Sequence, residues 1–107
     1  MLQNCQRRLQ VLVGELLKRA DDLDQESKFL DENALEQSWH DELARVCCDL
    51  VALGDTVKEV DILIREKQVK IVRRSLMRST DMASRIADRL RSMKRSSRLA
   101  DTKRVQG

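Results

Sequence analysis

The stretch that decides the fold is WHDELARVCCDLVALGDTVKEVDILI, residues 39–64. Its apolar side chains recur at alternating intervals of four and three residues without a slip, at Trp39, Leu43, Val46, Leu50, Leu53, Val57, Val60 and Ile64. This spacing places one apolar stripe along one face of a helix, and it is typical of helices that pack lengthwise against each other. The stretch therefore predicts a long helix at about 33–65.

One segment inside this stretch has the local pattern of a helix end. Gly54, Asp55 and Thr56, with Glu59 three residues after the threonine, resemble a stop followed by a new capping box. The unbroken register favours a continuous helix, because two separate helices would keep the same phase only by coincidence. A glycine inside a helix costs only about 1 kcal/mol relative to alanine. A break at 54–56 stays as the alternative.

The segment before this stretch predicts a first helix at about 2–25. Its apolar positions, at spacings of three and four, are Leu2, Cys5, Leu9, Leu12 and Leu16. Acidic residues then become frequent, and Asn33 followed by Glu36 has the form of a capping box. These features predict a turn near 25–33.

After Ile64 the apolar pattern changes phase, which predicts a turn near 65–69 and a third helix at about 69–104. Its stripe consists of Val69, Val72, Leu76, Ser79, Ala83, Ile86, Leu90, Met93, Ser97 and Ala100. The Ser-Thr-Asp sequence at 79–81 carries cap chemistry, so a break at 79–80 is a second alternative. Around this change of phase the sequence is apolar on two sides of the helix, and a helix that is apolar on two sides is covered by neighbours on both. An apolar interface is therefore predicted at Ile62, Val69, Val72 and Leu76.

The composition favours the all-α class over any fold with strands. Proline is absent, there are three glycines, Phe, Tyr and Trp total two, and 36% of the residues are charged. We predict a single helical domain over 1–107, built as an antiparallel bundle of three (or four) long helices with coiled-coil-like heptad packing. A Z-shaped chain that needs a second copy is the third layout. The predicted core is Leu9, Leu12, Leu16, Trp39, Leu43, Val46, Leu50, Leu53, Val57, Val60, Ile64, Leu76, Ile86 and Leu90.

The sequence contains no pattern that predicts an enzyme, a metal site or a cofactor. The single histidine, His40, and the three cysteines, Cys5, Cys47 and Cys48, lack the paired spacing of a zinc site. No phosphate-binding loop or nucleophile motif is present. Adjacent cysteines in an odd total favour a reducing compartment, and there is no apolar run of membrane-span length. We therefore expect a cytoplasmic protein, with the nucleus as the alternative.

Charge is divided sharply along the chain. Residues 1–66 carry eight Lys/Arg and fifteen Asp/Glu, whereas residues 67–107 carry thirteen Lys/Arg and three Asp/Glu. The basic block can pair with the acidic block, within one chain or between two copies, or it can face an acidic partner. The predicted basic face consists of Arg74, Arg78, Arg85, Arg89, Arg91, Lys94, Arg95 and Arg98.

These observations give two hypotheses for function. The first is a non-enzymatic module for protein–protein interaction, an adaptor or a subunit of a larger coiled-coil assembly, whose basic C-terminal helix contacts an acidic or helical partner. A homo-oligomer is included in this hypothesis. The second is an electrostatic binder of nucleic acid or another polyanion. Duplex binding requires only spaced cations, but the lack of aromatic side chains disfavours binding of single strands.

Overall fold

The protein consists of three helices, as shown by a computed structural model that describes the backbone of residues 2–28 and 35–106 and the side-chain surroundings of 3–28 and 35–99. The helices are α1 (Leu2–Ser27), α2 (Gln37–Arg65) and α3 (Val69–Gln106), and there is no strand in the described backbone. The all-α class is confirmed. The proposed capping residue Asn33 lies outside the described residues, and the N-cap of α2 is Glu36, whose side chain makes no capping bond.

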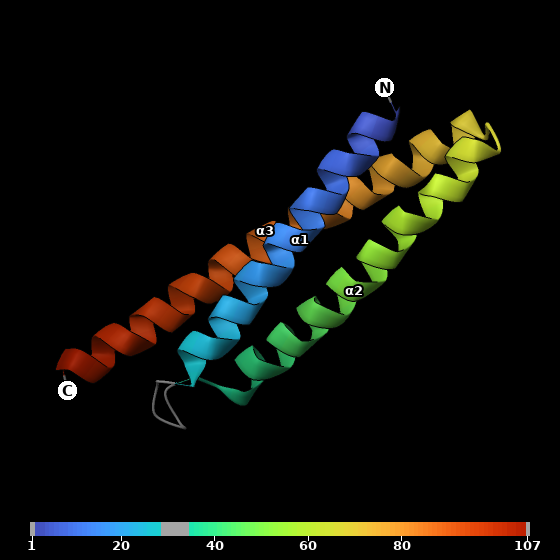
Figure 1. Ribbon diagram of the computed structural model, residues 1–107. Coiled ribbons are helices and arrows are strands. Elements are labelled where there is room, and N and C mark those ends of the chain that lie inside the picture. The colour runs from blue at the N-terminus through green and yellow to red at the C-terminus, as the bar shows by residue number, and fades with distance from the viewer. Residues whose placement is uncertain (1, 29–34, 107) are drawn as a thin grey trace.

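The helices lie along one another, and each contacts the other two (Figure 1). The chain runs down α1, back along α2 and down again along α3, which extends past the other two helices at its C-terminal end. The Cα positions span 60 × 19 × 17 Å. The end with the turn between α2 and α3 also holds the N-terminus of α1, so residues far apart in sequence meet there.

Neither α2 nor α3 is broken at the positions where local patterns suggested a break. α2 continues through 54–56, and the four-helix layout is therefore wrong. α3 likewise continues through 79–80, where Ser79 is buried against the core. The Thr80 hydroxyl donates a hydrogen bond to the Leu76 carbonyl at 2.8 Å, as serine and threonine do inside helices. The side chains that could have capped a new helix are thus used within a continuous one.

The turn between α2 and α3 closes without a glycine. The amide of Lys67 donates to the Ile64 carbonyl and the amide of Gln68 donates to the Leu63 carbonyl, both at 3.0 Å. These two bonds make a Schellman motif, whose C′ residue adopts the left-handed conformation and is usually glycine. Here the residue is Lys67, with a φ of 59°. The sequence shows no turn former at this place, because Lys67 occupies the C′ position where glycine is usual.

Replacing Lys67 by glycine should stabilise the protein by about 0.5–1 kcal/mol. The left-handed conformation costs a non-glycine residue about 1–2 kcal/mol, and the greater freedom of glycine in the unfolded chain offsets part of the gain. Urea unfolding would measure the change. Lys67→Ala is the control, since it removes the charge but keeps Cβ. Equal gains in the two variants would attribute the effect to charge instead of backbone conformation.

The core runs the length of the three helices and contains most of the predicted side chains. Its apolar members are Leu9, Val13, Leu16, Ala20, Leu23, Trp39, Leu43, Val46, Leu50, Leu53, Val57, Val60, Val72, Leu76, Ala83, Ile86, Ala87, Leu90 and Met93. Of the fourteen predicted core residues, Leu12 and Ile64 are only half-buried and pack against its edge.

The phase of α1 differs from the predicted stripe at its N-terminal end. Cys5 is exposed, whereas Gln6 and Val13 are buried. Gln6 occupies an inward position because its side-chain amide donates to the Val57 carbonyl of α2 at 2.9 Å. A buried amide with a hydrogen-bond partner is tolerated in a core, so a polar residue here extends the stripe. The sequence prediction ran the stripe through Cys5 and Leu12, because an apolar spacing of three and four residues passes over the polar Gln6.

Candidate interaction surface on α3

The eight cations of the predicted basic face do not share one face of α3. Arg74 and Arg78 lie beside α2, where they line a groove with Ala52, Leu53 and Thr56. Arg91 and Lys94 lie beside α1, where they line a depression with Arg19, Asp22, Leu23 and Glu26. Arg85 is exposed on the same flank as Arg78 and Arg89, from which it is seven and four residues away. Arg95 and Arg98 are exposed near the C-terminal end, and Arg98 has a polar partner.

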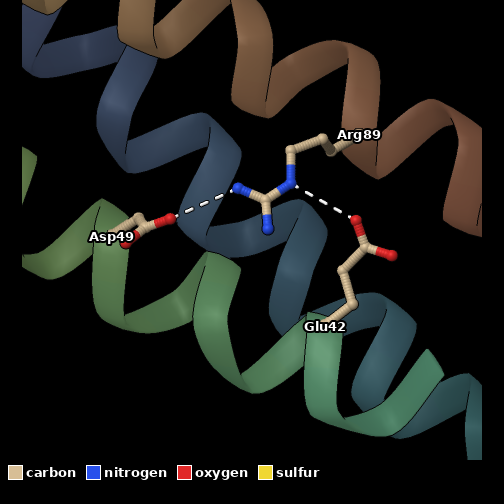
Figure 2. A network of polar contacts seen from close by, with 3 residues as sticks. All are labelled: Glu42, Asp49 and Arg89. Carbon is tan, nitrogen blue, oxygen red and sulfur yellow. Dashed lines mark hydrogen bonds and ion pairs between the residues drawn. The ribbon is translucent and has the colours of Figure 1, made fainter. Parts of the chain in front are cut away.

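Arg89 is bound within the chain. Its guanidinium lies between two carboxylates of α2, as Figure 2 shows. Nε donates to Oε1 of Glu42 and Nη1 donates to Oδ2 of Asp49, each at 3.3 Å. Glu42 and Asp49 are seven residues apart, which places them on the same side of α2 two turns apart. One arginine of the basic block therefore joins α3 to the acidic half of the same chain.

This ion-pair network should contribute modestly to stability. All three side chains are about a third to a half exposed, and exposed pairs are weakened by solvent screening. A double-mutant cycle of Arg89→Ala and Glu42→Ala should give a coupling energy of about 0.5–1 kcal/mol that shrinks in 1 M salt. Arg85→Ala, the matched control, should change stability by less than about 0.5 kcal/mol. A coupling energy that does not depend on salt would contradict an ionic origin.

Charge is balanced at the end of the bundle that contains this network. Residues 15–28, 36–50 and 83–99 form that end, and together they carry ten Lys/Arg and ten Asp/Glu. The C-terminal half of α3 therefore lies against acidic stretches of α1 and α2. The numbers of acidic and basic side chains are therefore equal at this end, where Arg89 and Arg91 form ion pairs.

Charge is not balanced at the other end, near the turn between α2 and α3. Residues 3–14, 51–68 and 69–82 carry nine Lys/Arg and five Asp/Glu, and α1 contributes no acid there. α3 itself has Lys70, Arg73, Arg74 and Arg78 around Met77, with Asp81 as the nearby acid. None of these four cations makes an ion pair or side-chain hydrogen bond with the residues the structure describes. The first turn of α3 has no acidic residue, so the helix dipole adds to the positive potential.

Apolar side chains are exposed among these cations. Met77 is 70% exposed on the outer side of α3, Ile71 is 51% exposed and Met82 is 47% exposed. Ile71 and Met82 line the groove between α2 and α3, together with Ala52, Leu53, Thr56, Arg74, Ser75, Arg78 and Ser79. We call this the α2–α3 groove. It is lined mainly by apolar and small side chains, and two arginines stand along its α3 side.

The four residues of the predicted apolar interface are divided between surface and core. Ile62 and Val69 are exposed near the turn between α2 and α3. Val72 and Leu76 are buried in the core of the same chain and are not available to a partner. α3 starts at Val69, and its inward stripe begins at Val72. The second apolar side in the sequence of this region is therefore the inward side of a separate helix. The change of phase in the sequence marks the turn between α2 and α3.

No group of three metal-ligating side chains comes together among the described residues. Burial, together with the negative charge of Asp24, raises the pKa of the half-buried Cys47 thiol, which favours its protonated form. His40 stacks edge-on against Trp39, with ring centroids 5.1 Å apart. No helix in the described part of the chain is long and apolar enough to cross a membrane.

Comparisons with known proteins supply no family for this chain. No protein-family model, no curated protein and no solved structure matches it. The candidate surface therefore rests on its own residues, geometry and charge.

Proposed function

We propose that this chain is a non-enzymatic helical module for protein–protein interaction, which binds an acidic partner through the N-terminal half of α3. Its three helices form an antiparallel bundle with coiled-coil-like heptad packing, and this bundle serves as a rigid support for the binding surface. An adaptor, or a subunit of a larger helical assembly, needs this property and no catalytic group.

The observation that supports the proposal is the uncompensated positive end of the bundle with apolar side chains in it. Lys70, Arg73, Arg74 and Arg78 have no acidic partner among the described residues, whereas Arg89 has two. Arginine and methionine are enriched at protein interfaces, where guanidinium groups pair with carboxylates and flexible thioethers adapt to the partner. Exposed Met77 and Met82 thus favour a protein partner over a purely electrostatic one.

Binding to a polyanion is the second candidate function. The four cations are close enough to contact successive phosphates, and such contacts need no apolar surface. The apolar lining of the neighbouring α2–α3 groove has no role in phosphate binding, and for this reason we place the protein partner first.

The test compares two pairs of charge reversals that change the net charge equally. R74E/R78E alters the uncompensated end, while K18E/R95E alters exposed cations away from it. Proteins that copurify with the tagged chain after nuclease treatment would be identified by mass spectrometry. We expect R74E/R78E to lose a partner that K18E/R95E retains. Equal recovery with both pairs would contradict the proposal, and loss of every partner on nuclease treatment would support the polyanion instead.

A further inference from the structure

We infer that the α2–α3 groove is the seat of an acidic amphipathic helix from a partner protein, which packs lengthwise as a fourth helix. This inference rests on the proposed function, since it names the kind of partner and where it binds. The groove is open and lined by Ala52, Leu53 and Thr56 of α2 and by Ile71, Ser75, Ser79 and Met82 of α3. Small side chains in this lining let another backbone approach, and Ile71 and Met82 offer apolar area that is half exposed.

The length of the groove suits a short helix. Its α3 side extends from Ile71 to Met82, and a rise of 1.5 Å per residue makes this about 16 Å, or about three helical turns. A helix lying along it would present apolar residues at positions i, i+3 or i+4, and i+7, which is the pattern of helices bound in grooves. The required occupant is therefore amphipathic and about three turns long at the contact.

The positive charge along the groove determines the charge that the bound helix must carry. Arg74 and Arg78 are four residues apart on its α3 side, so their Cα atoms are separated by about 6 Å along the helix axis. No acidic residue lines the α2 side of the groove. Carboxylates spaced four residues apart on the incoming helix would lie opposite the two guanidinium groups, with which they can form bidentate contacts. This side of the occupant must be acidic.

A second copy of the chain does not supply such a helix. Its acidic helices, α1 and α2, already bury their apolar stripes in their own core, at residues such as Leu16, Leu23, Leu43 and Leu50. Exposing one of these stripes would require the donor bundle to unfold. The occupant is thus a helix of another protein, and a dimer becomes an outcome that the experiment can detect.

The probe is a synthetic peptide of about 18 residues, with leucines at helical spacing and glutamates flanking them at i and i+4. A second peptide has lysine in place of every glutamate. Binding to the whole chain is followed by the ¹³C-methyl NMR signals of its methionines, of which Met82 lies in the groove, Met77 on the outer side and Met93 in the core. We expect the acidic peptide to shift the methyl signal of Met82 more than that of Met77. It should also bind at least about tenfold more tightly than the lysine peptide.

The variants then locate the charge contacts. R74E/R78E should weaken binding of the acidic peptide by at least about tenfold, and K18E/R95E should change it by less than about twofold. Arg74 and Arg78 are exposed and make no ion pair with the described residues, so circular dichroism should show an intact fold for R74E/R78E. An intact R74E/R78E variant that binds the acidic peptide as well as the unchanged chain would overturn the inference.

Other results separate this inference from the proposed function. Shifts at Met77 without shifts at Met82 would overturn binding in the groove, while an acidic partner on α3 would still stand. A dimer in light scattering that R74E/R78E dissociates would make a second copy the occupant and overturn the inference. Unchanged binding of the acidic peptide by R74E/R78E, together with equal recovery of copurifying proteins by R74E/R78E and K18E/R95E, would contradict the inference and the proposed function together.

Discussion

Replacing Leu50 by alanine should destabilise the protein by about 2–5 kcal/mol, one of the two largest effects we expect from a single substitution. Leu50 lies in the middle of α2 with 0% of its side chain exposed, and it belongs to the set of largest fully buried side chains. The substitution removes three carbon atoms and leaves a cavity that neighbouring helices fill only partly. Because the free energy of unfolding of native proteins is about 5–15 kcal/mol, this loss is a large part of the total stability.

Thermal unfolding followed by circular dichroism measures this effect, which should lower Tm by about 10 °C or more. Val51→Ala is the matched control, since Val51 is the next residue of the same helix and is 56% exposed. We expect that variant to change stability by less than about 0.5 kcal/mol. Equal melting temperatures for Leu50→Ala and the unchanged chain would show that the stripe of α2 does not face the core.

Replacing Trp39 by alanine should cost about 3–5 kcal/mol. Trp39 is 7% exposed at the N-terminal end of α2, and it is the largest side chain in the core. Its indole Nε1–H donates to the Met93 carbonyl of α3 at 3.0 Å, within a buried environment. The residue therefore combines a large apolar area with a hydrogen bond between helices, both of which the substitution removes.

Trp39→Phe separates these two contributions. Phenylalanine keeps much of the apolar bulk but cannot donate to Met93, so we expect a loss of about 1–2 kcal/mol. Chemical denaturation of the three proteins would give the comparison. Equal losses in the alanine and phenylalanine variants would contradict a packing role for Trp39 and attribute its contribution to the hydrogen bond alone.

The stripes of α2 and α3 were predictable because apolar side chains occupy nearly every inward position. Residues from Trp39 to Val60 keep one register, and all seven predicted positions in that range are buried. The prediction for α1 was less complete, because inward positions there include a glutamine and an alanine. Gln6 gave no apolar signal, and its burial depends on a carbonyl of another helix that the sequence does not reveal.

The candidate surface was predictable only in part. The sequence identified the arginines of α3 as a row, since it shows their abundance and only Asp81 and Asp88 as acids between them. It did not show that Arg89 lies between Glu42 and Asp49, or that Arg74 and Arg78 lie along a groove with Ala52 and Thr56. Those relations depend on how the helices are aligned lengthwise, which local sequence does not specify.

The sequence by itself determined the helical class and the inward face of α2 and α3, because these follow from composition and from spacing along one chain. It favoured a continuous α2, and the structure excluded the break at 54–56. Only the tertiary structure decided which charges are compensated. The arrangement of the helices places the acidic parts of α1 and α2 beside the C-terminal half of α3 and leaves Arg74 and Arg78 beside neutral side chains of α2. The interaction energy of two charges depends on the distance between them, and the packing of the three helices sets those distances.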